Sequence, residues 1–420
     1  MSVWDAVIGQ PEAVGALRAA ARSAAEIAAG RPGGPATMTH AWLFTGPAGS
    51  GRSVAARAFA AALQCERSAD PADTGDSAGP VDPADPADPN GSDLLGCGQC
   101  AACRTVAART HADVHSVVPE GLSIGVDEMR AVVGRAARRP SLGRWQVVVI
   151  EDADRLTEQA ANALLKAVEE PPARTVFLLC APSLHPDDVS LTIRSRCRLV
   201  ALRTPAADAV AEVLERGGVD ADTARWAAAA GQGHVGRSRR LARDADARSR
   251  RAEVLAIPAS LTSLAACLRA ADHLVGAAEA EAGALSAELD AGETESLQVA
   301  LGAGATGRGV ASAVRGSAGA LRELEKRQKS RATRAQRDAL DRALVDLAAF
   351  YRDVLLAQAG SPVAPAHPDF ADDVAAVGRQ VASAGVLQRL SAILACREAL
   401  DQNVKPRIAV EALTAALRLP

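Results

Sequence analysis

Aromatic side chains are scarce in this sequence. Tryptophan, tyrosine and phenylalanine make up only 2% of the 420 residues, although hydrophobic residues as a whole make up 48%. The core must therefore consist mainly of alanine, valine, leucine and isoleucine. Runs rich in alanine, leucine, arginine and glutamate follow residue 205, and these residues favour helices. A chain of this length has room for two or three domains.

Three other features are missing. The N-terminus has no cationic segment followed by an apolar run, so we expect no secretory signal. No apolar run reaches the roughly 18 residues that a membrane-spanning helix needs. The formal net charge of −3 argues against a chain coated in positive charge, so any contact with DNA would have to be local. We therefore expect a cytoplasmic protein.

Residues 40–200 alternate short β-rich runs with helical patterns, which is typical of an α/β domain with a parallel sheet. The predicted strands are residues 42–45, 147–150 and 176–180. Their continuous apolar character suits strands that are covered on both faces. Residues 66–96 interrupt this domain with an acidic, proline-rich stretch, for which we predict a disordered loop.

A glycine-rich segment follows the first predicted strand and precedes a helical pattern, as a phosphate-binding loop does. The segment fits the pattern GxxxxGK[ST] at every position but one, because Arg52 replaces the lysine. A planar guanidinium cannot take the place of a compact ammonium between two phosphates. A chance glycine-rich turn is the alternative. The candidate nucleotide-binding residues of this loop are Gly46, Gly49, Gly51, Arg52 and Ser53.

Glu151 and Asp152 follow the second predicted strand. An active ATPase of this type would have the order Asp-Glu, with the aspartate holding Mg²⁺ and the glutamate polarising water. In the reversed order, each carboxylate is one methylene too long or too short. The pair can also be read as plain surface acids. With Arg52, this second departure predicts that ATP binding is weak or absent and that hydrolysis is inefficient.

Four segments together resemble the clamp-loader branch of the AAA+ ATPases, and the match covers about residues 1–240. They are Val7-Ile8-Gly9-Gln10; the run from His40 to Pro47; Asn162 to Lys166 with Glu169-Glu170-Pro171-Pro172; and Thr192 to Cys197, which contains Ser-Arg-Cys. Within that family the chain most resembles the delta-prime class of bacterial DNA polymerase III subunits. The ATP-hydrolysing gamma/tau class would keep the lysine and the Asp-Glu pair.

The resemblance implies a non-hydrolysing subunit of a ring that loads a sliding clamp onto primer-template DNA in chromosomal replication. Its partners would be gamma/tau-type ATPase and delta-type subunits. The expected fold is an AAA+ α/β domain (1–204), a three-helix lid (205–255) and an all-α collar domain (256–420).

The resemblance also assigns roles to two arginines. Arg196 would be an arginine finger, donated in trans to the ATP of a neighbouring subunit. Arg237 would correspond to the second sensor arginine of the family. The alternatives are that Arg196 pairs with a surface carboxylate and that Arg237 is a solvated residue near a helix start.

Cys97, Cys100 and Cys103 form the pattern Cys-x2-Cys-x2-Cys, and Cys65 is a plausible fourth ligand. Four thiolates at a tetrahedral centre are typical of structural zinc. Iron–sulfur binding is the sharpest alternative, but position 107, where a ferredoxin motif requires its next cysteine, is Ala107. Unmetallated thiols are a further alternative. We predict zinc in a module spanning residues 65–103.

Two basic clusters are candidates for DNA contact through phosphates, although most such runs are solvated helix faces. They comprise Arg135, Arg138, Arg139 and Arg144, and residues 326–331. Two other functions remain open. One is an active ATPase of the clamp-loader type, and the other is a zinc-dependent module that binds nucleic acid.

Overall fold

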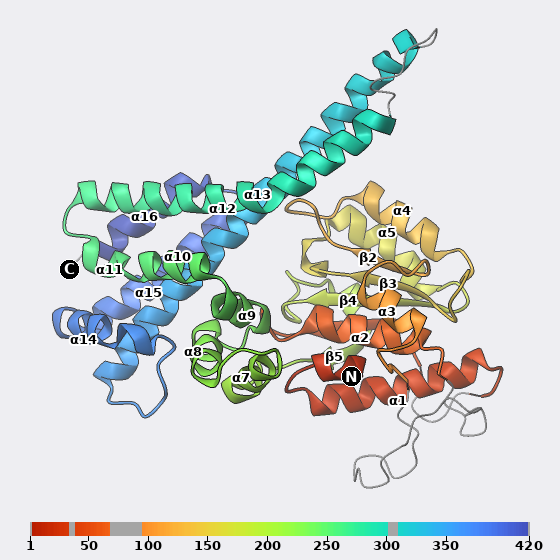
Figure 1. The fold of residues 1–420 in the computed structure, drawn as a ribbon, viewed down its shortest axis with the longest axis horizontal. Helices are drawn as coiled ribbons and strands as arrows, with labels where there is room; N and C mark the ends of the chain where they lie inside the picture. Colours follow the sequence, from red (N-terminus) through yellow and green to blue (C-terminus); the bar gives the residue numbers. More distant parts are fainter. Residues whose placement is uncertain (1, 33–37, 68–94, 301–309, 419–420) are drawn as a thin grey trace. The chain divides into compact units, whose positions relative to one another are not determined.

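The computed structural model describes residues 2–32, 38–67, 95–300 and 310–418. The chain divides into two compact units (Figure 1). The first contains residues 1–119, 123–218 and 233–237, and the second contains residues 120–122, 219–232 and 238–420. The predicted loop at 66–96 lies largely outside the described residues. A glycine-rich stretch of the sequence, residues 302–309, lies wholly outside them.

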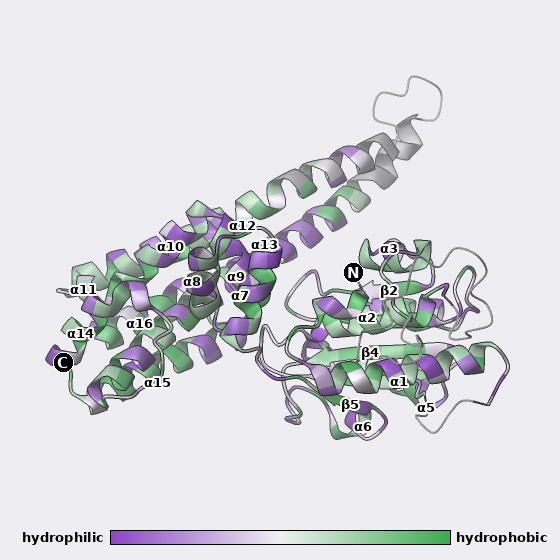
Figure 2. Cartoon of the chain, turned by 60° about the horizontal axis from the view of Figure 1, so that its bottom comes forward, coloured by the Kyte–Doolittle hydropathy of each residue, from purple (hydrophilic) through white to green (hydrophobic). Residues whose placement is uncertain are grey.

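The first unit is built on a five-stranded parallel sheet with the strand order β2-β3-β4-β1-β5. The strands are β1 (Ala41–Thr45), β2 (Val114–Val117), β3 (Gln146–Ile150), β4 (Thr175–Ala181) and β5 (Arg198–Ala201). The three strands predicted from continuous apolar runs are confirmed as β1, β3 and β4, which are buried along their whole length. Figure 2 shows the hydrophobic colour of β4.

Helices cover both faces of this sheet, as the apolar strands predict. One face packs with α1 (Pro11–Ala28) and α2 (Arg52–Gln64), and the other packs with α4 (Val126–Ala136) and α5 (Glu158–Glu169). Trp42 of β1 meets Phe59 of α2 edge-on, with ring centroids 5.0 Å apart. The few aromatic residues of this unit are thus placed in its core.

Shorter elements complete the first unit. They are the 3-10 helices η1 (Val3–Ala6) and η3 (Ala153–Arg155), with the helices α3 (Ala101–Ala107), α6 (Leu191–Arg194) and α7 (Ala207–Arg216). Helix α9 (Val235–Arg243) begins in the first unit and ends in the second.

The second unit is helical in its described residues. It contains α8 (Ala221–Gly231), α10 (Ala245–Leu255), α11 (Ile257–Ser260), α12 (Leu264–Ala300), α13 (Val310–Gln358), η4 (Pro368–Phe370), α14 (Ala371–Gln380), α15 (Ser383–Asp401) and α16 (Pro406–Arg418). Its core is mainly aliphatic, with the adjacent rings of Phe350 and Tyr351. The predicted helical C-terminal half is confirmed.

Residues 205–255 form four helices, α7 to α10, so the expectation of three was wrong. The extra boundary is the Asp244 cap, whose side chain accepts a hydrogen bond from the N–H of Ala247 at 3.1 Å. The domain limits at 204 and 255 stay predictions. Among the described residues, no helix combines the length and the apolar character needed to cross a membrane.

Candidate functional site

The phosphate-loop residues lie between the end of β1 and the start of α2. Gly46, Gly49 and Gly51 all have positive φ angles, of 154°, 85° and 92°. A Cβ atom on Gly46 would lie 2.4 Å from the carbonyl oxygen of Leu202, and one on Gly49 would lie 2.6 Å from the Cα of His234. At Gly46 and Gly49, close packing as well as backbone conformation therefore requires glycine.

His234 is a residue of this region that the sequence did not reveal. It precedes α9 and lies directly against Gly49 of the loop. Its Nδ1 accepts a hydrogen bond from the backbone N–H of Arg237 at 3.3 Å. His234 therefore contacts both the first turn of α9 and the loop. Nearly 190 residues separate His234 from the loop, and no local pattern predicts this contact.

The Gly9-Gln10 motif reaches the same loop through a buried side chain. The Nε2 group of Gln10 donates to the carbonyl oxygens of Arg203 at 2.6 Å and Ser50 at 3.4 Å. Its Oε1 accepts from the N–H of Arg203 at 3.2 Å. Gln10 therefore connects the segment before α1 to the loop and to the chain that follows β5.

Arg52, which stands where an active loop has lysine, bonds to the loop itself. Its guanidinium donates to the carbonyl oxygen of Gly46. Ser53 follows it in the first turn of α2 and is half-buried. The guanidinium of Arg52 is thus hydrogen-bonded to a backbone carbonyl of the loop that would bind the phosphate.

Glu151, at the end of β3, is held by two arginines. Its Oε1 lies 3.0 Å from Nη1 of Arg57 and 3.3 Å from Nη2 of Arg109. Only 14% of its side chain is exposed, so solvent screens the pair with Arg57 weakly, whereas Arg109 is about half exposed. The next residue, Asp152, has a φ angle of 53°. Burial raises the pKa of nearby Asp154, and its Oδ1 has no hydrogen-bond partner among the described residues.

Arg196 follows the short helix α6 and is held by three groups. Its Nη2 forms an ion pair with Glu169 at 2.6 Å. Its Nη1 donates to the carbonyl oxygen of Thr192 at 3.0 Å and to the hydroxyl of Ser195 at 3.1 Å. These contacts fix the guanidinium, and it is also accessible, because 37% of the side chain is exposed. Arg196 therefore does pair with a surface carboxylate, as the alternative interpretation expects.

The next residue, Cys197, is a packing residue. Burial raises the pKa of its thiol to about 12.

The four predicted metal ligands come together. The Sγ atoms of Cys65, Cys97, Cys100 and Cys103 all lie within 4.8 Å of one another. Zinc–sulfur bonds of about 2.3 Å in a tetrahedron require sulfur atoms roughly 3.8 Å apart, so this donor set fits a zinc ion. Cys65 caps the end of α2, and Cys100 caps the start of α3.

Backbone groups support these thiols. The Sγ of Cys97 accepts from the N–H groups of Gln99 at 3.4 Å and Cys100 at 3.3 Å. The Sγ of Cys100 accepts from the N–H of Cys103 at 3.4 Å. A hydrogen bond from the Cys103 thiol lowers the pKa of Cys65 to about 4, against the opposing effect of burial. The same hydrogen bond, together with burial, raises the pKa of Cys103, and burial raises the pKa of Cys100. Of these three thiols, Cys65 is therefore the one favoured as thiolate, the form that binds metal.

The N-terminus secures the first part of this module. The indole N–H of Trp4 donates to the carbonyl oxygen of Leu95 at 3.0 Å. The N–H of Val3 donates to the carbonyl oxygen of Gly96 at 2.8 Å. A Cβ on Gly96, whose φ angle is 86°, would lie 2.6 Å from the Val3 side chain. The turn before Cys97 is thus fixed by contacts with η1.

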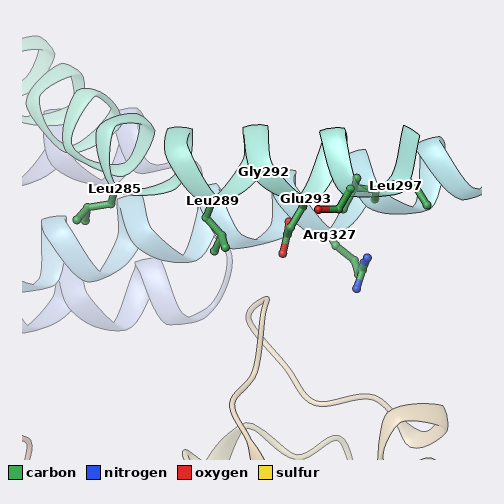
Figure 3. A pocket seen from close by; sticks show the side chains of 8 residues that line it. Leu285, Leu289, Gly292, Glu293, Leu297 and Arg327 are labelled. Atoms are coloured by element: carbon green, nitrogen blue, oxygen red, sulfur yellow. The ribbon is translucent and has the colours of Figure 1, made fainter. Parts of the chain in front are cut away.

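The first basic cluster reaches the metal module at one residue, because Nη2 of Arg144 donates to the carbonyl oxygen of Glu66, next to Cys65, at 3.4 Å. Arg135 and Arg138 add to burial in lowering the pKa of His115 on the edge strand β2. In the second cluster, Arg331 pairs with Asp290 at 2.9 Å and with Glu293 at 2.5 Å. Figure 3 shows the adjacent groove on α12 and α13. Its lining includes Leu285, Leu289, Gly292, Glu293, Ser296, Leu297, Leu324 and Arg327. DNA contact by either cluster stays a prediction.

Comparison with known proteins agrees with the motifs. The family described as DNA polymerase III, delta subunit, matches residues 86–206. The DNA polymerase III subunit delta' of Pseudomonas aeruginosa is 38% identical over 186 residues, which are 44% of this chain and 49% of that protein. The Escherichia coli subunit delta' is 43% identical over 111 residues, or 26% and 33% of the two chains.

A subunit of another class is also similar. The DNA polymerase III subunit tau of Bacillus subtilis is 33% identical over 161 residues, which are 38% of this chain and 24% of that protein. The chain spans about half or less of the length of these three relatives. The matches and the parallel sheet with its helical C-terminal part confirm the AAA+ fold class predicted from the sequence.

Proposed function

Starting from its confirmed resemblance to the clamp-loader family, and within that family to the delta-prime subunits, we propose that this chain is a non-hydrolysing clamp-loader subunit of DNA polymerase III. Its partners in this proposal are gamma/tau-type ATPase subunits and a delta-type subunit. Through the complex it acts on a sliding clamp and on primer-template DNA. ATP binds to this chain weakly or not at all.

The observation that carries the proposal is that the charged groups of the nucleotide site, Glu151 and Arg52, are already bound to other groups of this chain. Glu151 is paired with Arg57 and Arg109, which reduces its ability to help hold Mg²⁺. The Arg52 guanidinium donates to the Gly46 carbonyl oxygen rather than standing free for a phosphate. An active ATPase would need both groups to be released and would still lack the lysine and the Asp-Glu order.

The chemistry contributed by this chain would come from Arg196. An arginine finger stabilises the charge that develops on a phosphoryl group in the transition state of a neighbouring site. The partial exposure of Arg196 supports this role, since a finger must be accessible from outside its own subunit. The four cysteines would hold zinc, which supplies folding energy and no catalytic step.

The test is DNA-stimulated ATP hydrolysis by a ring reconstituted with gamma/tau-type and delta-type subunits. Arg196→Ala should lower turnover at the shared site by roughly 10³-fold while ring assembly, followed by size-exclusion chromatography, is unchanged. Arg196→Lys should not restore it, because a lysine cannot bind phosphate oxygens in two-pronged fashion. Arg194→Ala is the matched control, because Arg194 also lies at the end of α6. Unchanged turnover in an assembled Arg196→Ala ring would contradict the finger role.

A second measurement addresses the rival function. The isolated chain should show no ATP turnover above background. Magnesium-dependent hydrolysis that disappears in Ser53→Ala would identify this chain as an active ATPase of the clamp-loader type.

A further inference from the structure

Three anchors of Arg196 use one end of its guanidinium and leave another edge open. Nη1 donates both of its hydrogens, to the carbonyl oxygen of Thr192 and the hydroxyl of Ser195, while Nη2 pairs with Glu169. The described part of the chain offers no hydrogen-bond acceptor to the Nε–H group of Arg196. A guanidinium has five N–H donors in a fixed plane, so the edge formed by Nε and Nη2 remains available.

This arrangement resembles how an arginine would be prepared for a phosphate. Two parallel N–H groups of one arginine can bind two phosphate oxygens together, and this geometry depends on the orientation of the plane. A free arginine side chain has many rotamers, and holding it in one of them before binding removes that entropic cost from the reaction step. The anchors therefore fix the plane and leave two N–H groups for a phosphate, the Nε–H and the second N–H of Nη2, whose first is shared with Glu169.

Glu169 is the one charged group among the three anchors. It ends α5, and its side chain is 41% exposed, so it contributes little to the core. The next residue, Glu170, is also exposed and makes no ion pair with any described residue. Of two adjacent glutamates, only Glu169 lies within reach of the arginine.

We propose that Glu169 is a positioning residue that orients Arg196 toward a phosphate of a neighbouring subunit's nucleotide. This inference rests on the proposed function, since it requires that Arg196 acts in trans. Glu169 itself touches no nucleotide and transfers no proton. Its effect is to keep the Nη2 end of the guanidinium in place while the Nε–H group stays without an acceptor among the described residues.

The experiment uses the reconstituted ring and compares Glu169→Ala, Glu169→Gln and the matched control Glu170→Ala. Glu169→Ala should lower kcat for DNA-stimulated ATP hydrolysis at the shared site by roughly ten- to hundredfold, since misorientation of one group costs about that much. KM for ATP should change less than about twofold, because the neighbouring subunit still binds the nucleotide. Glu169→Gln should retain part of the rate, since its amide oxygen can still accept, and Glu170→Ala should retain all of it.

A double variant separates this inference from the proposed function. In the Arg196→Ala background, Glu169→Ala should have no further effect, because Glu169 acts only through the arginine. A further loss in that background, or normal or raised turnover in Glu169→Ala alone, would overturn the positioning role. If Arg196→Ala lowers turnover and Glu169→Ala does not, the positioning role fails and the proposed function stands. If Arg196→Ala itself has no effect, the arginine-finger role within the proposed function fails first, and the positioning role fails with it.

Discussion

Helix α2 has a candidate site at each end, and the two differ in whether they retain the residues that ligand binding requires. At its N-terminus, the phosphate loop keeps its glycines but has lost the lysine, and the arginine in that place bonds to the loop. At its C-terminus, Cys65 lies with three other thiols in a set fit for zinc. The helix has 13 residues, which is roughly 20 Å in length. The two sites thus differ in how complete their ligand groups are, although one short helix joins them.

The comparison separates shape from chemistry. A phosphate loop can be kept for its packing, because the loop glycines accommodate His234 and Leu202 and Gln10 bonds to the Ser50 carbonyl oxygen. A four-thiol site is kept only if something binds it or if its buried thiols pack well. The loop glycines are consistent with a structural role at the first site, and the complete donor set favours a bound metal at the second.

The largest effect that we expect comes from the metal site. Cys100→Ser should abolish binding of one zinc ion per chain and lower stability by several kcal/mol, because metal binding contributes to folding. A loss of about 3 kcal/mol corresponds to roughly 6–12 °C in Tm for a domain of about 200 residues. Elemental analysis and thermal unfolding measure the two quantities. Gln99→Ala, an exposed change in the same turn, is the control. A chain that purifies without metal and is unaffected by Cys100→Ser would show that the thiols are not a zinc site.

The second effect tests whether the loop glycines serve packing. Gly49→Ala should destabilise the chain by about 2–5 kcal/mol, because a positive φ angle costs about 1–2 kcal/mol and the new Cβ would overlap His234. Gly51→Ala has the same backbone penalty but meets no atom within 4 Å, so its cost should stay near about 1–2 kcal/mol. Chemical denaturation of both variants without nucleotide measures the difference. Equal losses would show that contact with His234 does not constrain Gly49.

The third effect concerns Asp113, a buried residue directly before β2. Burial opposes its ionisation, but the N–H groups of residues 141–143 and the Ser141 hydroxyl lower its pKa to about 2. The folded pKa lies below the unfolded value, so its stabilisation is present above about pH 4 and is lost as pH falls toward 2. Asp113→Asn should therefore cost about 2 kcal/mol at pH 7 and progressively less below pH 4. Asp127→Asn, at an exposed i,i+3 pair, is the control. A cost that does not vary with pH would assign the effect to packing alone.

The sequence predicted the elements whose signal is local. The strands β1, β3 and β4 are continuous apolar runs, whereas β2 and β5, which lie at the sheet edges, contain polar residues such as His115 and Arg198 and were not predicted. The four cysteines were predicted from spacing and lie together, including Cys65 across a long interruption. Because few residue types bind zinc, the spacing of cysteines in the sequence is enough to predict which of them lie together at a metal site.

The partners of the acidic pair could not be predicted. Arg57 and Arg109 are 94 and 42 residues away from Glu151, and surface arginines are common in this chain. The contact of His234 with Gly49 could not be predicted for the same reason, because it depends on where the fold places the start of α9. Local patterns identified the loop and the acids, but only the fold shows that protein groups already engage them.

The smallest effect is the most direct test of the difference between the two ends of α2. Arg52→Lys restores the missing cation, yet we expect no measurable ATP turnover by the isolated chain. Glu151 would still be paired with Arg57 and Arg109, and the order of the two acids would still be reversed. Adding Glu151→Asp and Asp152→Glu shortens the paired side chain and restores the usual order, so we expect this variant to bind nucleotide more tightly with Mg²⁺ than without it, as measured by calorimetry. Ser53→Ala in the same background is the control that assigns any binding to the loop. If Arg52→Lys alone produced magnesium-dependent hydrolysis, one residue would have silenced the site. The pairing of Glu151 would then be a consequence of that loss, with no part in causing it.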